Sequence, residues 1–206
     1  MKKTLFTAAV LAAFTFSACS ENAETAETAV GENMDMEMPA EAEATTVVVE
    51  TPDFSSVAEP VQNQISQLVD AYLNLKEALV ASDATAAKAA ASNVLEIARA
   101  MPVANLEADA KAYAEEKTAK VIETAEAIAA AEEIAAQRES LEPLSEATFA
   151  LTKAFNAADQ TLYYQRCPMA LNNKGAYWLS SNEEIRNPYF GEQMLKCGST
   201  EEVYQN

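Results

Sequence analysis

The stretch from 105 to 158 contains 54 residues and no glycine, and it is rich in Ala and Glu. As one continuous helix it would be about 80 Å long, at 1.5 Å per residue. The helices predicted before it are too short to cover such a length, so the stretch must fold back on itself. We place the turn near 130–133, where length matching alone favours it, and a kink at Pro143 is the competing choice.

Two helices are predicted before this stretch. The first starts near Glu59, has Pro60 in its first turn, and carries an apolar stripe with 4-3-4-3-4 spacing. The second is capped by Asp83, is closed by Pro102, and has a stripe of smaller residues. The first stripe is Val61, Ile65, Leu68, Tyr72, Leu75 and Leu79, and the second is Ala87, Ala91, Val94, Ala98 and Met101.

Together these segments predict an all-α fold, an antiparallel four-helix bundle over residues 59–160, followed by an irregular segment with a small hairpin over 161–206. The core candidates in the third and fourth helices are Leu106, Tyr113, Val121, Ile128, Ile134, Leu141, Leu144, Phe149, Leu151 and Phe155.

Composition excludes several classes of function. The formal net charge is −18, which disfavours a nucleic-acid partner through repulsion by the phosphate backbone. The chain has no histidine, which removes the usual general base and the Ser-His and Cys-His nucleophile pairs. It also excludes a bundle di-metal site at Glu132-Glu133 with Glu139 and Glu142, because such sites need Glu-x-x-His pairs. We therefore predict that the chain is not an enzyme.

Residues 161–206 differ from the rest in containing three of the four glycines, the single tryptophan and two of the three cysteines. Two aromatic segments, 162–166 and 176–179, flank the turn-forming run 172–175 and predict a hairpin. A helix over 189–196 is then predicted, with an N-cap and Pro before it and a glycine after it. On such a helix Met194 and Cys197 would share a face.

Three interpretations of the sulfur residues remain open. Cys167 and Cys197 can form a disulfide, the default in an exported protein. Alternatively, their thiolates and one or both of Met169 and Met194 bind a soft monovalent ion, Cu(I) or Ag(I). Core packing by the methionines is compatible with either.

Residues 1–18 have the plan of an export signal: Lys2 and Lys3, an apolar run over 5–16, and small residues before Cys19. The small residue directly before the cysteine resembles a bacterial lipobox, in which the cysteine is lipidated. An ordinary secretory signal is the alternative. Ser20 after the cysteine favours the outer membrane, with the periplasmic face preferred over the cell surface.

Residues 19–58 are predicted to be a disordered acidic tether. Within 20–58 there are ten acidic residues and no Lys or Arg, and hydrophobic periodicity is absent apart from 47–49. The run Met34-Asp-Met36-Glu-Met38 resembles the methionine-rich segments of periplasmic copper proteins, which indicates a secondary site for weak metal capture. Chance in a low-complexity tract is the alternative.

The run CPMALNNKGAYWLS…IRNPYFGEQMLKCG, with YLNLKEALVASD and QRESLEPLSEATF before it, resembles a bacterial exported helical domain family of unknown function. Members of that family occur as small lipoproteins and as extensions of periplasmic adaptor subunits of heavy-metal and copper efflux systems. The resemblance covers about residues 60–203. It implies Cys167, Met169, Met194 and Cys197 as a ligand set, with scaffold roles for Gly175, Trp178, Asn187, Pro188 and Gly191.

From the residues and the resemblance we expect a lipid-anchored periplasmic protein that sequesters Cu(I), or a similar soft metal, or passes it to an efflux adaptor. The alternative is a metal-free structural or adaptor lipoprotein stapled by a disulfide between Cys167 and Cys197.

Overall fold

The computed structural model describes residues 49–56 and 59–206. The predictions for the signal peptide, for lipidation at Cys19, for the methionines at 34, 36 and 38 and for most of the tether lie outside the described residues. The helical elements are α1 (Glu59–Val80), α2 (Ala84–Arg99), η1 (Val103–Asn105), α3 (Ala108–Ala130), α4 (Ile134–Glu139), α5 (Leu141–Ala154), α6 (Ala170–Asn173) and η2 (Gly191–Met194). The strands are β1 (Leu162–Cys167), β2 (Ala176–Ser180) and β3 (Ser199–Tyr204).

The first two helices form as their apolar stripes predict. Every member of both stripes is buried. Asp83 is the N-cap of α2, and its carboxylate accepts a hydrogen bond of 2.9 Å from the backbone N–H of Ala86. Both stripes therefore face one core, and α2 starts where its cap places it.

The long glycine-free stretch turns at residues 131–133, between α3 and α4, as length matching predicts. A second break follows at Ser140, which ends α4 and precedes α5. Pro143 lies in the first turn of α5, where a missing N–H costs no helical hydrogen bond. The stretch thus gives one long helix and two shorter ones, and Pro143 lies near the start of the last one instead of kinking a continuous helix.

The helices pack side by side around a shared core. α1 contacts α2 and α5, and α3 also contacts α2 and α5. Alanines on α2 and α3 are fully or almost fully buried at these seams, which allows the helix axes to approach closely. Three predicted core residues, Leu106, Tyr113 and Ile134, are only partly buried. Among the described residues, the helices include none long and apolar enough to span a membrane.

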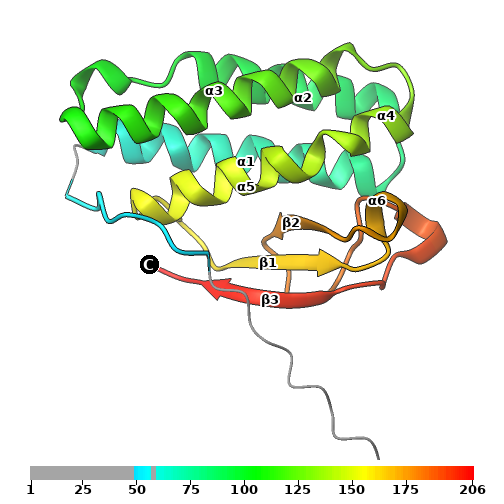
Figure 1. The fold of residues 1–206 in the computed structure, drawn as a ribbon. Helices are drawn as coiled ribbons and strands as arrows, with labels where there is room; N and C mark the ends of the chain where they lie inside the picture. Colours follow the sequence, from blue (N-terminus) through cyan, green and yellow to red (C-terminus); the bar gives the residue numbers. More distant parts are fainter. Residues whose placement is uncertain (1–48, 57–58) are drawn as a thin grey trace, which may run out of the picture. The chain divides into compact units, whose positions relative to one another are not determined.

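The C-terminal segment is a three-stranded antiparallel sheet with the order β2-β1-β3. The prediction of an all-α fold is wrong here, although the hairpin of β1 and β2 is confirmed. β3 was missed because STEEVY has two adjacent glutamates and no regular alternation, and its pairing with β1 shifts register at Tyr164 and Gln165. The molecule is therefore mostly helical with a small sheet, and the sheet lies against the α5 side of the helices (Figure 1).

Residues 49–56, which the sequence assigns to the tether, pack against the folded domain. The Phe54 ring contacts those of Tyr113 and Phe155, at centroid distances of 5.7 and 5.4 Å. Its backbone N–H donates to the carbonyl of Ala154. Docking of this segment is hard to predict from the residues, because one aromatic side chain in an acidic tract makes the ring contacts.

Candidate functional site

The two C-terminal cysteines meet at one end of the sheet. Cys167 is the last residue of β1 and is fully buried, and Cys197 lies half-buried in the turn before β3. Their sulfur atoms are 2.8 Å apart, and either thiol can donate the hydrogen bond between them. The residue types predict this proximity as one possibility, and the structure brings the two side chains into direct contact.

Asn187 holds the loop that carries Cys197. Its side-chain amide donates to the carbonyl of Cys197 at 2.8 Å, and its backbone N–H donates to the carbonyl of Leu195 at 2.8 Å. Its side-chain oxygen accepts the N–H of Tyr189 at 2.8 Å, so the predicted capping interaction is present. Because Asn187 is completely buried and binds both ends of the loop, it fixes the position of the second cysteine.

The helix predicted over 189–196 does not form. Gly191 has φ +57°, outside the right-handed helical region, and only the short η2, which begins at this residue, forms here. A side chain at Gly191 would lie 2.6 Å from Ser82 Oγ and 2.8 Å from the carbonyl of Val80. The absence of a side chain at Gly191 allows the loop to pack against the turn between α1 and α2.

Arg138 ties this loop to the helices, a role that sequence reasoning missed. Its guanidinium donates to the carbonyl of Pro188 at 2.7 Å, to the carbonyl of Leu79 at 3.0 Å and to Ser82 Oγ at 2.8 Å. The available signal was weak: an arginine near the end of a short helix in an Ala/Glu-rich stretch. Together with Gly191, it makes the loop part of the folded domain.

Gly198 permits the close approach next to the cysteines. It has φ +141°, and a side chain there would lie 2.7 Å from the carbonyl of Arg166 and 2.9 Å from the ring of Trp178. Trp178 is fully buried and packs edge-on against Tyr189, with centroids 6.0 Å apart. These contacts place the strand that follows Cys197 directly beside the end of β1.

The two predicted methionine ligands lie in different surroundings. Met194 ends η2, and its carbonyl accepts the N–H of Cys197 at 3.0 Å. Met169 is 46% exposed and lines a surface hollow of about 450 Å³ together with Arg138 and Tyr189, and no cysteine lines that hollow. Among the described residues, the hydrogen bond that each cysteine thiol makes is with the other thiol. The four-residue ligand set therefore stays a prediction.

The cysteine pair favours the neutral thiol form. The hydrogen bond that the Cys197 thiol makes to Cys167, with smaller effects from burial and from the charge of Cys167, raises the pKa of Cys197 to about 11 from an ordinary 9.0. The described residues contain no group of three or more His, Cys, Asp and Glu side chains that could hold a metal ion. A metal bound at the pair must therefore displace protons, and its affinity should rise with pH.

Two adjacent thiols support two kinds of chemistry. Oxidation joins them into a disulfide, while deprotonation makes them soft sulfur ligands of the type that Cu(I) and Ag(I) prefer. The chain has no histidine, and among the described residues no cluster of three or more Cys, Asp and Glu side chains includes the cysteine pair, so any ligands at the pair are sulfur atoms.

Residues 68–160 match a family described as Protein of unknown function (DUF3347). No match was found among curated proteins or among solved structures. The family match runs from α1 to just after α5 and supports the expected domain of unknown function. It ends before β1, so the cysteine pair and the rest of the sheet lie outside the matched residues.

Proposed function

We propose that this chain is a lipid-anchored periplasmic protein that binds Cu(I), or a similar soft metal, through Cys167 and Cys197. The observation that carries the proposal is the direct contact of the two cysteine sulfurs, 2.8 Å apart, at the end of the sheet. Sulfur ligands select soft monovalent ions over the hard cations that carboxylates bind. Met194, whose backbone contacts Cys197, and Met169 complete the proposed ligand set.

Redox state gates the site in this proposal. In the reduced protein both sulfurs are available to the metal, while a disulfide between Cys167 and Cys197 excludes it. Forming that disulfide releases two electrons and two protons, which an external oxidant such as another protein's disulfide must take up. Closing a loop of 30 positions (197 − 167) in this way stabilises the fold by roughly 3–4 kcal/mol in the chain-entropy model.

The cellular setting belongs to the same proposal. Cys19 is the lipidation site, the anchor is in the outer membrane, and the methionines at 34, 36 and 38 aid local capture. An efflux adaptor subunit is the proposed recipient of the metal, on the strength of the family resemblance. We also propose that α1, α2, α3 and α5 form the expected four-helix bundle, which their pairwise packing supports.

A second candidate is a metal-free adaptor lipoprotein in which the cysteine pair is a structural disulfide. Two observations favour it: Cys167 is completely buried, and Met169 lines a separate hollow. In this candidate the methionines have no role in binding, and docking to a protein partner is the function.

Substitution of the methionines separates the two candidates. We expect the double variant Met169→Leu, Met194→Leu to lose at least tenfold in Cu(I) affinity, measured on the reduced protein against a competing Cu(I) chelator. Met101→Leu is the matched control, since Met101 is buried in the helical core. If the double variant keeps full affinity, the methionines are not ligands. If Cys167→Ser also keeps full affinity, the proposed site itself is wrong.

A further inference from the structure

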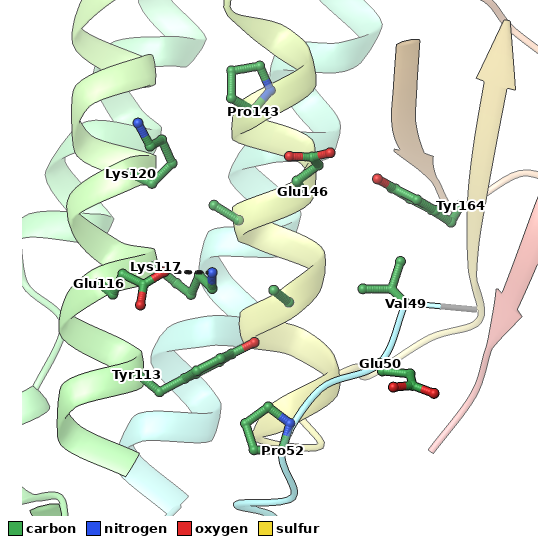
Figure 2. Close-up of a pocket in the computed structure, with 12 residues that line it drawn as sticks. Val49, Glu50, Pro52, Tyr113, Glu116, Lys117, Lys120, Pro143, Glu146 and Tyr164 are labelled. Carbon is green, nitrogen blue, oxygen red and sulfur yellow. Dashed lines mark hydrogen bonds and ion pairs between the residues drawn. The ribbon is translucent and has the colours of Figure 1, made fainter. Parts of the chain in front are cut away.

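A second hollow, unrelated to the cysteines, lies between α3, α5 and the segment 49–52 (Figure 2). Its volume is about 470 Å³, within the range of pockets that hold small organic molecules. Tyr113, Pro52 and Pro143 supply apolar surface, and Tyr164 of β1 closes the side that faces the sheet.

Tyr164 supplies a polar group that a ligand in the hollow can reach. The residue is only 3% exposed, but its hydroxyl is not among the fully buried polar atoms, so the oxygen opens into the hollow. Figure 2 shows the phenol pointing toward Glu146 on α5. No other side chain of the described residues makes a hydrogen bond to this hydroxyl, so it can accept a hydrogen bond from a molecule that enters the hollow.

The ring of Tyr164 is held rigidly. It stacks on Phe149 at 4.7 Å and on Tyr177 at 4.9 Å, between centroids. Burial, followed by the charge of Glu146, raises the pKa of Tyr164, so its hydroxyl stays protonated at neutral pH. The hollow therefore presents a fixed neutral hydroxyl beside a carboxylate.

The charge left over in the hollow is negative. Lys117 is paired with Glu116 at 2.8 Å, and Lys120 is paired with Glu123 at 2.6 Å, so each lysine already has a carboxylate in contact with it. In contrast, Glu146 and Glu50 line the hollow without an ion-pair partner among the described residues. The charge of Glu146 reaches Lys117 and raises its pKa, but no ammonium group in the described part of the chain pairs directly with Glu146 or Glu50, so an incoming cation can contact both carboxylates.

The wall formed by the segment 49–52 is fixed in place. Lys153 and Glu202 form an ion pair whose side chains are 12% and 10% exposed. Lys153 donates to the carbonyl of Val49 at 2.6 Å, and Glu202 accepts the N–H of Val49 at 2.9 Å. Because both backbone groups of Val49 are held by this buried pair, the hollow keeps its shape without a ligand.

We propose that this hollow binds an organic cation, a primary ammonium or guanidinium group on an apolar body. The charged head lies between Glu146 and the Tyr164 hydroxyl, and the body packs against Tyr113 and Pro143. A free amine and a Lys or Arg side chain of a partner protein share this chemistry.

Three probes of equal size test the charge preference. Binding of 2-phenylethylammonium, 2-phenylethanol and phenylacetate is measured by NMR titration of the soluble chain from Ser20 onward. We expect the ammonium to bind at least tenfold more tightly than the alcohol or the acid. Equal binding of the three probes, tighter binding of the acid, or no binding of the ammonium up to 10 mM would overturn the proposal. The peptide acetyl-Gly-Arg-Gly-amide distinguishes the sources: tighter binding than the ammonium assigns the hollow to a partner's side chain, and weaker binding assigns it to a free amine.

Two variants locate the probe. We expect Glu146→Gln and Tyr164→Phe each to weaken binding of the ammonium about 5- to 20-fold, since each removes one contact to the charged head. Glu96→Gln on the exposed face of α2 removes the same charge far from the hollow and should change the affinity less than twofold. If Glu96→Gln weakens binding as much as Glu146→Gln, the effect is one of net charge and the site is wrong. Cys167→Ser should leave binding unchanged, so this test is independent of the proposed metal site.

Discussion

Tyr72 is predicted to be the residue whose hydroxyl matters most for joining the sheet to the helices. It lies on α1, is completely buried, and its oxygen is 2.7 Å from Ser145 Oγ on α5 and 3.0 Å from the backbone nitrogen of Leu179 on β2. Ser145 also donates to the carbonyl of Leu141 at 2.7 Å. The donors can therefore be assigned: the N–H of Leu179 donates to Tyr72, Tyr72 donates to Ser145, and Ser145 donates to Leu141.

The substitution Tyr72→Phe keeps the ring and removes only the hydroxyl. The N–H of Leu179, which is fully buried, then loses its partner, and an acceptor site of Ser145 is emptied. One unsatisfied buried donor costs about 1–3 kcal/mol, so with the second lost bond we expect a destabilisation of about 2–3 kcal/mol. In a domain of this size that corresponds to a decrease in Tm of about 4–12 °C.

Thermal unfolding followed by circular dichroism measures this loss. Tyr163→Phe is the matched control, because Tyr163 is half-buried on β1 and its hydroxyl makes no hydrogen bond within the described residues. We expect the control to change the free energy of unfolding by less than about 0.5 kcal/mol. If Tyr72→Phe is as mild as the control, the hydrogen-bonded chain through Tyr72 does not join α1, α5 and β2.

Three further predictions concern the docked segment 49–56, the sheet and the cysteine thiols. Lys153→Met should lower the free energy of unfolding by about 3 kcal/mol, because it leaves Glu202 buried without a partner, and it should speed up hydrogen exchange at 49–56. Adding Glu202→Leu to the same chain should restore part of this stability. Unchanged exchange at 49–56 would count against the docking of this segment. Gly198→Ala should lower the free energy of unfolding in urea by about 2 kcal/mol, since the added Cβ would lie 2.7 Å from the carbonyl of Arg166. An unchanged free energy of unfolding would contradict the close packing at the start of β3. Alkylation of Cys197 in the reduced protein should be about 100-fold slower at pH 8 than that of a thiol with the ordinary pKa of 9.0, because a pKa of about 11 lowers the thiolate fraction. The alkylation rate should keep rising with pH up to about 11. A plateau of the rate near pH 9 would refute the raised pKa.

The helical part of the fold could be predicted because its signals are local and repeated. The stripe on α1, the cap at Asp83 and the length limit on 105–158 each depend on nearby residues or on simple geometry, and the structure has α1, α2 and the turn at 131–133 where they place them. The division at Ser140 was missed because Pro143 fits both a kink and the start of a helix.

The sheet and the loop before it were harder to predict because long-range contacts decide them. Gly191 follows a good N-cap and proline, which favours a helix, but its packing against Ser82 requires a positive φ. β3 has little pattern of its own and depends on pairing with β1. In the candidate site, the pairing of Cys167 with Cys197 was anticipated from their residue types, whereas the roles of Arg138 and Asn187 in fixing the loop depend on residues far apart in the sequence.

The most direct test of the proposed function is a Cu(I) titration of the soluble chain from Ser20 onward, in the reduced and the oxidised state, against a competing chelator. We expect one tightly bound equivalent in the reduced protein, none at the cysteine pair in the oxidised protein, and loss of the tight site in both Cys167→Ser and Cys197→Ser. Absence of tight binding in the reduced protein, or equal tight binding in the oxidised protein, would contradict a redox-gated metal site at Cys167 and Cys197.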